Sequence, residues 1–154
     1  MPKLSDDIRQ QVSDLLSEQI PLCQAMGLEL KHLSLAHVRL SMPLDVNVND
    51  KGTAFGGSIA AALTLAGWSL LTTRLLHEGL DADLMIHRSD IIYERPVNTD
   101  FHAYCDWLDE EDWQTFLNQL RRRGRARLVM KSWVAGDQHA AATMTGSFVA
   151  IMRS

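Results

Sequence analysis

The sequence predicts an α+β fold in which an antiparallel sheet of about six strands wraps around one long helix. The helix is predicted because Gly56 to Thr73 carries no charge and has apolar residues on nearly every face. A helix of this kind is buried in a protein or a membrane, and this run is at the short end of what a membrane span needs. Alternating apolar and polar residues before and after it indicate half-buried strands. A sheet with one apolar face needs a partner to cover it, and the helix is the simplest one.

Length and composition favour a single domain over residues 1–154. Apolar residues make up 46% and charged residues 22%, which are ordinary globular values. The net charge of −4 gives no general nucleic-acid footprint. Cys23 and Cys105 are too few for a disulfide framework, so we expect a cytoplasmic protein. The first ten residues lack the apolar core of a targeting signal, and no membrane association is expected.

The segment before the central helix predicts one helix and two strands. Residues 1–21 form a packing helix that Ser5 caps and Pro21 ends. One apolar stripe supports it: Ile8, Val12, Leu15, Leu16 and Ile20. Strands are expected at 28–33 and, with cleaner alternation, at 38–44.

After the central helix, for which Gly79 is the stop signal, the pattern predicts mostly hairpin-linked strands and one short helix. Gly124 follows three arginines and caps that short helix. The expected strands are 84–95, 100–107, 125–134 and 139–153, with the short helix at 109–123.

The start of the central helix, at Gly56-Gly57, is the first candidate for chemistry. The first backbone N–H groups of a helix have no intrahelical partner and lie at the positive end of the helix dipole. Two glycines let a ligand oxygen approach without meeting a Cβ. Such a site binds phosphate or polarises a carbonyl group, although a tight turn without any ligand explains the glycines equally well.

Two motifs resemble the hot-dog-fold thioesterase superfamily. Asn49-x-x-Gly52-Thr53-x-Phe55-Gly56-Gly57 is similar to the N-x-x-G-x-x-H-G-G signature of small acyl-CoA thioesterases, including the phenylacetyl-CoA type. Tyr93-x-Arg95-Pro96 resembles the Y-x-R-P sequence that follows on the strand after the helix. The resemblance covers residues 28–152, and it is strongest to the thioesterase-like domain that some bacterial proteins carry fused to an acetyltransferase.

The resemblance implies catalytic roles for three residues. The Gly57 N–H would polarise the thioester carbonyl, and Asn49 would hold that carbonyl or the attacking water. Thr64 stands where the family usually has its catalytic carboxylate, seven residues beyond the second glycine. A hydroxyl orients water but is a poor base, which leaves the general base open. An Asx-turn at Asn49 and a bond from Thr64 to the carbonyl four residues back are the structural alternatives.

Other residues are expected to contact substrate. Phe55, which replaces the signature histidine, lies at the helix start with Gly56 and Ser58. On the following strand His87 and Ser89 are also expected to contact substrate, and His87, Ser89 and Asp90 are the nearby polar candidates for the group that deprotonates the water. The histidines show no metal-ligand spacing, so no metal is expected.

The basic run that contains Arg121, Arg123 and Arg125 has two interpretations. It either caps a helix and continues as a solvated strand face, or it anchors the phosphates of coenzyme A or an acidic acyl carrier protein.

The function expected from the resemblance is hydrolysis of acyl thioesters of coenzyme A or acyl carrier protein, within fatty acid metabolism. Coenzyme A enters as part of the substrate, and no other cofactor is expected. Family members form homodimers or dimers of dimers, with sites at the subunit boundary. The alternative is a non-catalytic module that binds acyl thioesters or docks a carrier protein. A hot-dog dehydratase ranks third, because no histidine with an acidic partner stands at the helix start.

Overall fold

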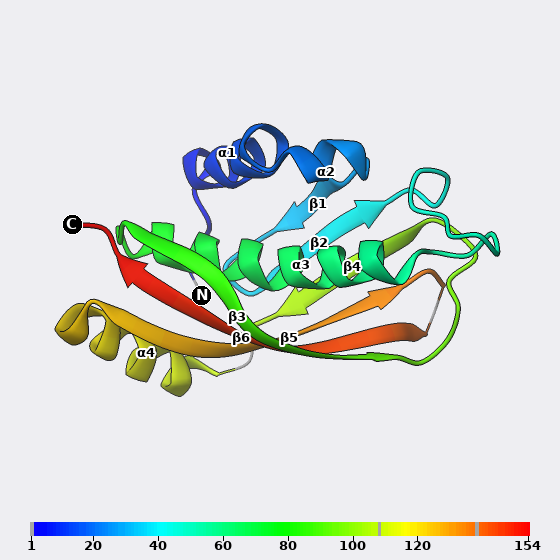
Figure 1. Ribbon diagram of the computed structural model, residues 1–154. Coiled ribbons are helices and arrows are strands. Elements are labelled where there is room, and N and C mark those ends of the chain that lie inside the picture. Colours follow the sequence, from blue (N-terminus) through cyan, green and yellow to red (C-terminus); the bar gives the residue numbers. More distant parts are fainter. Residues whose placement is uncertain (1, 108, 138) are drawn as a thin grey trace.

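The computed structural model describes residues 2–107, 109–137 and 139–154. Its strands form one antiparallel sheet in the order β1-β2-β4-β5-β6-β3, curved around α3 (Figure 1). The strands are β1 (Glu29–Leu33), β2 (His37–Met42), β3 (Ala82–Tyr93), β4 (Phe101–Asp106), β5 (Arg125–Ala135) and β6 (Ala140–Met152). The helices are α1 (Asp6–Asp14), η1 (Leu15–Gln19), α2 (Pro21–Ala25), α3 (Gly56–His77) and α4 (Glu110–Arg123). The predicted α+β architecture is confirmed.

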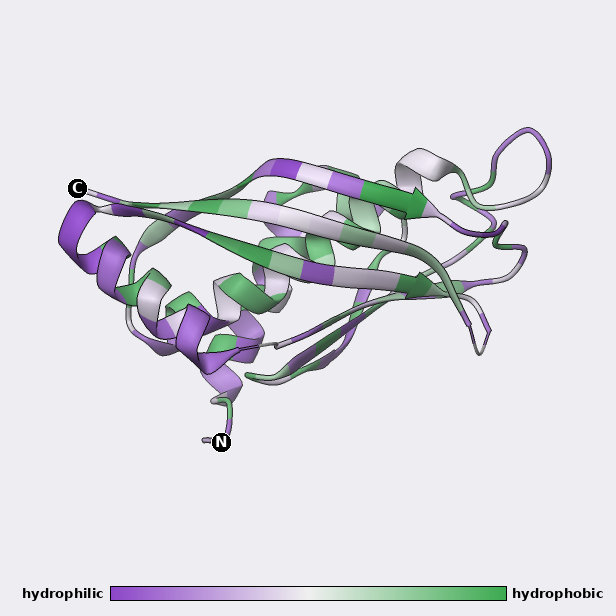
Figure 2. Ribbon diagram, turned by 90° about the horizontal axis from the view of Figure 1, so that it is seen from below, coloured by the Kyte–Doolittle hydropathy of each residue, from purple (hydrophilic) through white to green (hydrophobic). Residues whose placement is uncertain are grey.

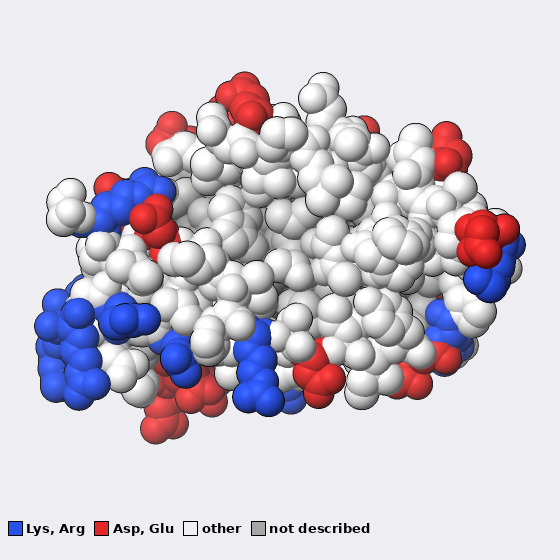
Figure 3. Space-filling view, viewed as in Figure 1, with Lys and Arg blue, Asp and Glu red and all other residues white. Residues whose placement is uncertain are grey.

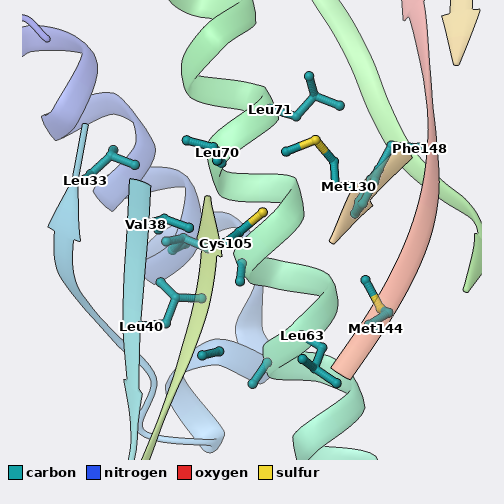
Figure 4. Close-up of a cluster of buried hydrophobic side chains, with 14 of the residues drawn as sticks. Leu33, Val38, Leu40, Leu63, Leu70, Leu71, Cys105, Met130, Met144 and Phe148 are labelled. Atoms are coloured by element: carbon teal, nitrogen blue, oxygen red, sulfur yellow. The ribbon is translucent and has the colours of Figure 1, made fainter. Parts of the chain in front are cut away.

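The central helix α3 is buried because its apolar residues contact five of the six strands, β2 to β6. Leu63, Leu70 and Leu71 point into a cluster with side chains from β2, β4, β5 and β6 (Figure 4). Gly67 permits close packing, since a Cβ there would lie 3.0 Å from the ring of Phe148. By length and composition α3 could also cross a membrane, but 67% of its most apolar window is buried inside the protein.

The N-terminal segment contains a π-helical turn, η1, that the sequence pattern does not predict. Ser5 caps α1 as predicted, its Oγ accepting from the Ile8 N–H at 3.2 Å. The helix then widens into η1 before it ends ahead of Pro21. Pro21 also begins α2, a short helix that was not predicted, in the first-turn position that suits proline.

The strand connections differ from the hairpins that the sequence pattern favours. Residues 82–93 and 100–107 follow one another in sequence, but β3 pairs with β6, whereas β4 lies between β2 and β5. Among the described residues, the consecutive strands that are neighbours in the sheet are β1–β2, β4–β5 and β5–β6, and α4 lies between β4 and β5 in the chain. The physical reason is that the sheet must enclose α3 from both sides, so the strand after the helix closes the far edge.

The β3 edge of the sheet is long, with exposed apolar residues toward both ends and the exposed polar residues 87–90 between them. β3 has 12 residues, against five in β1 at the other edge. Met85, Ile86, Ile92 and Tyr93 of β3 are all exposed. Polar and apolar segments alternate along the strands seen in Figure 2. A long edge strand with unpaired backbone groups and exposed apolar side chains near both ends favours pairing with another strand.

The C-terminal end of α3 is closed by α4. Arg74 of α3 is only 6% exposed, and its Nε donates to the Leu35 carbonyl at 2.7 Å. Its guanidinium also bonds Glu110 of α4 at 2.8 Å and stacks 4.0 Å above the Trp107 ring. Because Arg74 joins three segments, it holds α4 against the core.

Candidate functional site at the start of the central helix

The loop before α3 is organised by the side chain of Asn49. Its Oδ1 accepts from the backbone N–H groups of Lys51 (2.8 Å) and Thr53 (3.1 Å). Its Nδ2 donates to Thr53 Oγ1 at 2.8 Å and to the Ala54 carbonyl at 3.5 Å. Gly52 completes the turn with a φ of +83°, which an L side chain rarely adopts. The amide of Asn49 is therefore engaged within its own loop, as in the Asx-turn alternative.

Asn47 is a second asparagine in this loop, and the sequence reasoning missed it. It is 2% exposed, and its Nδ2 donates to the carbonyls of Met26 (2.8 Å) and Pro43 (2.7 Å). Its backbone carbonyl accepts from the Phe55 N–H at 2.7 Å. Its buried Oδ1 finds no hydrogen-bond partner among the described residues. The signal available in the sequence was an asparagine two residues before Asn49; its burial and its bond to Met26, which tie the loop to the core, appear only in the structure.

The N-terminus of α3 is open. The N-cap residue is Phe55, and no side chain caps the helix. The first-turn N–H groups of Gly56, Gly57 and Ser58 can therefore donate hydrogen bonds to a ligand. The Phe55 ring lies over Gly57, where a Cβ would come within 2.4 Å of it. The Tyr93 hydroxyl donates to the Gly56 carbonyl at 3.2 Å, which joins the end of β3 to the start of α3.

Thr64 lies two turns into α3, facing β6. Its hydroxyl donates to the Ala60 carbonyl at 2.9 Å and lies 3.8 Å from the sulfur of Met144. This is the helix back-bond that the structural alternative anticipates. The oxygen lone pairs remain able to accept a hydrogen bond, but no carboxylate occupies this position.

The register of β3, which the sequence does not give, places Ser89 on the helix side of the sheet. Ser89 lies opposite Gly146, and Ile91 lies opposite Met144, the residue that Thr64 contacts. Opposite residues share a face, so Ser89 and Thr64 lie on the same side of the sheet, whereas Asp90 points to the other side. The pairing skips His87, which forms a bulge between Ile86 and Arg88. Bulges re-aim side chains and are frequent beside active sites.

The three arginines predicted to contact substrate lie at the other end of α3. Arg121 bonds Glu78, just after α3, at 3.4 Å, and Arg123 and Arg125 line an open groove at the start of β5. Blue atoms gather at this end in Figure 3. The 22 residues of α3 span about 33 Å, so one chain does not bring these arginines to Gly57.

Both cysteines, Cys23 and Cys105, are buried and unpaired with each other. Burial, with a contribution from Asp106, raises the pKa of Cys105 to about 12. The protonated thiol donates to the Lys131 carbonyl at 3.2 Å and is a poor nucleophile. The described residues hold no group of three or more His, Cys, Asp or Glu side chains that could bind a metal ion.

Comparison with known proteins identifies the family. Residues 9–152 match the family described as "Putative thioesterase (yiiD_Cterm)". The match spans nearly the whole chain, and the protein belongs to this family.

Solved structures show the same fold. A protein of unknown function from Chlorobaculum tepidum TLS has 26% identity and a TM-score of 0.92, over 97% of this chain and 98% of that one. A "putative thioesterase" from Shewanella oneidensis has 24% identity and a TM-score of 0.85, over 96% and 99%. A thioesterase family protein from Silicibacter pomeroyi has 19% identity and a TM-score of 0.72, over 95% and 99%. The predicted hot-dog fold of the thioesterase superfamily is confirmed.

Proposed function

We propose that the protein hydrolyses thioesters that join acyl groups to coenzyme A or to acyl carrier protein. The observation that carries the proposal is the uncapped N-terminus of α3 at Gly56-Gly57, held in place by the Asn49 loop. Membership of a thioesterase family supports the reaction class.

In this proposal the thioester carbonyl oxygen accepts a hydrogen bond from the Gly57 N–H. The positive end of the helix dipole then stabilises the negative charge that develops as water adds to the carbonyl carbon. The C–S bond breaks, and the departing thiolate takes up the proton that the attacking water loses. Thr64 and Ser89 accept hydrogen bonds from the water, and Asn49 acts as a positioning residue because its amide shapes the loop. Without a carboxylate at Thr64, turnover depends on carbonyl polarisation and is slow.

A second copy of the chain is the partner that best fits the β3 edge. Antiparallel pairing of β3 about its own midpoint, with two-fold symmetry, would place Tyr93 beside Ala82 of the partner subunit. Since Tyr93 bonds Gly56, each helix start would face the partner's α4 end. Arg121, Arg123 and Arg125 would thus anchor the phosphates of a substrate whose thioester lies in the other subunit. A dimer of dimers would leave this arrangement unchanged.

The rival function is a non-catalytic module that binds acyl thioesters or docks a carrier protein. Two observations favour it: the Phe55 ring covers Gly57, and the Thr64 hydroxyl donates to its own helix. Both features would weaken catalysis at Gly57 and Thr64 but would still allow an acyl thioester to bind.

Thiol release from acyl-CoAs and acyl carrier proteins of different chain lengths distinguishes the two functions. We expect release above background, and a fall of about tenfold or more for Asn49→Ala, because the loop that presents Gly57 loses its bonds. Asn118→Ala, on the exposed face of α4, is the matched control. Saturable acyl-CoA binding without release from any substrate would establish the binding module instead.

Sedimentation analysis tests the dimer. The wild type should sediment as a dimer or tetramer, and Ile92→Lys should dissociate it, because the substitution puts a charge among the exposed apolar residues of the β3 edge. Val129→Lys is the control, since Val129 is similarly exposed but lies on β5, away from the edge. A monomeric wild type would contradict the pairing.

A further inference from the structure

A cavity of about 530 Å³ lies between η1, the C-terminal half of α3 and the start of β3. This volume is typical of small-molecule sites. Figure 3 shows the hollow between the N-terminal helices and α3, with uncharged atoms inside it. Its inner wall is apolar, with Leu15, Trp68, Leu75, Leu76, Leu84 and Met85.

The wall of this cavity is preformed. The Trp68 Nε1 donates to the Leu84 carbonyl at 3.1 Å, which fixes the indole between α3 and β3. The opposite side of the cavity is formed by η1. Such π-helical turns are rare in proteins overall, and those that occur are often found at functional sites. An apolar space held open in this way suits an aliphatic chain, which needs no hydrogen-bond partner.

The cavity is distinct from the open start of α3 in the same chain. Trp68 lies eleven residues beyond Gly57, which is about 16 Å along the helix. In the dimer proposed above, however, the residues at the start of β3 that line the cavity would lie beside Tyr93 of the partner subunit. The cavity of one subunit would then open toward the thioester site of the other.

The polar rim of the cavity is acidic. Four carboxylates and one guanidinium stand among the described residues that line it. Arg153 pairs with both Asp81 and Asp83 at 2.7 Å, so the unbalanced charge belongs mainly to Asp14 and Glu18 of the N-terminal segment. A negative rim repels anionic groups and tolerates neutral ones.

We propose that this cavity receives the aliphatic tail of the acyl group, and that Asp14 and Glu18 select tails without a carboxylate. The inference rests on the proposed function and names its substrate class: thioesters of long, uncharged acyl chains. The N-terminal segment is thus a specificity element.

Direct binding tests the cavity without any need for catalysis. Calorimetry at low ionic strength would compare dodecanol with dodecanoate as probes. We expect dodecanol to bind at least tenfold more tightly than dodecanoate. Glu18→Gln combined with Asp14→Asn should narrow this ratio several-fold, whereas Glu111→Gln, a neutralisation on α4, should not. Equal affinities in the wild type, or no binding of dodecanol, would overturn the proposal.

Filling the cavity tests its location. Thr72 lines the cavity, and its buried Oγ1 has no hydrogen-bond partner among the described residues. Thr72→Phe should reduce dodecanol affinity about tenfold or more, whereas the isosteric Thr72→Val should retain it. Thermal unfolding would verify that both variants fold. Unchanged affinity in folded Thr72→Phe would place the tail elsewhere.

Steady-state kinetics separate this proposal from the proposed function. Thr72→Phe should lower the ratio of kcat/KM for lauroyl-CoA to that for acetyl-CoA about tenfold, and Thr72→Val should keep the wild-type ratio. Dodecanol binding without hydrolysis of any thioester would overturn the proposed function but support the cavity. Suppose instead that Thr72→Phe hydrolyses thioesters with an unchanged ratio of kcat/KM for lauroyl-CoA to that for acetyl-CoA. This result would overturn the proposal that the cavity holds the acyl tail, but it would support the proposed thioesterase function.

Discussion

The two ends of α3 are built in opposite ways. At the start, Phe55 provides no side-chain cap, and two glycines leave the backbone accessible. At the other end, buried Arg74 binds the Leu35 carbonyl, Glu110 and the face of Trp107. The helix is thus closed by side chains at its C-terminal end and open at its N-terminal end.

This difference indicates how stability and function are divided along one helix. The closed end supplies contacts between distant segments, which stabilise the fold. The open end leaves polar backbone groups without protein partners, which costs stability but provides donors for a ligand. Substitutions at the two ends should therefore separate unfolding from activity.

The largest expected effect is at the closed end. Arg74→Ala removes the buried guanidinium and leaves the Leu35 carbonyl without this donor, so the free energy of unfolding should fall by about 2–3 kcal/mol. Arg74→Lys keeps the charge but not the planar stacking, so its free energy of unfolding should lie between those of the wild type and Arg74→Ala. Urea denaturation measures both.

The kcat for thiol release per folded molecule should stay near wild type in the Arg74 variants, whereas KM for acyl-CoA should rise with any shift of α4, which carries Arg121 and Arg123. Arg74 is 17 residues from Gly57, which is about 25 Å along the helix. A fall in kcat that paralleled the fall in the free energy of unfolding would contradict the assignment of stability to the C-terminal end of α3 and of catalysis to its N-terminal end.

At the open end, Thr64→Asp supplies the carboxylate that a general base needs. We expect kcat/KM for acyl-CoA hydrolysis to rise about tenfold or more, since general-base catalysis contributes at least that much. The gain should grow with pH as the half-buried carboxyl ionises, because burial raises the pKa of an aspartate.

Thr64→Asn is the matched control, because it has a similar shape and no basic group. A rise in both variants would mean that polarity, rather than a base, limits turnover. No rise in either would favour the binding module.

A smaller effect is expected from Gly57→Ala. The new Cβ would lie 2.4 Å from the Phe55 ring, but this ring is exposed and can rotate, so unfolding should change by less than about 1 kcal/mol. Thiol release should fall several-fold, because the displaced ring and the methyl group crowd the Gly57 N–H.

The double variant Gly57→Ala with Phe55→Ala isolates the steric cause. It should recover much of the lost activity. Failure to recover would locate the effect in the methyl group itself.

The smallest effect involves a residue outside both ends. Burial, together with Arg39 and Lys31, lowers the pKa of His102 on β4. Since its folded pKa lies below the unfolded value of about 6.5, its contribution to stability is present above that pH and is lost as the pH falls. Urea midpoints at pH 7.5 and pH 5.5 should therefore differ less in His102→Gln than in the wild type. An equal difference would remove His102 from the pH response.

Local chemistry explains which elements were predictable. Ser5, Gly79 and Gly124 begin or end helices through a side-chain cap or a positive φ, and each depends on a few neighbouring residues. The start of α3 at Gly56 was predictable for the same reason. The bulge at His87 was not, because it appears only when β3 and β6 are aligned.

The candidate site could be predicted only in part from the sequence. The motif identifies Asn49, Gly57 and Thr64, and the structure adds that Asn49 and Thr64 make local hydrogen bonds. The helix-facing position of Ser89 and the buried amide of Asn47 depend on contacts between residues far apart in sequence. The distance between Gly57 and Arg121 likewise depends on the length and direction of α3.

The sequence by itself determined the composition of the core, the existence of α3 and its glycine start, because burial and backbone freedom follow from residue type. Tertiary structure alone decided that β3 forms the edge, that Arg74 closes one end of α3, and that a cavity remains beneath the N-terminal helices. These features arise from packing between segments far apart in the chain, and no periodicity or motif within one segment records such contacts.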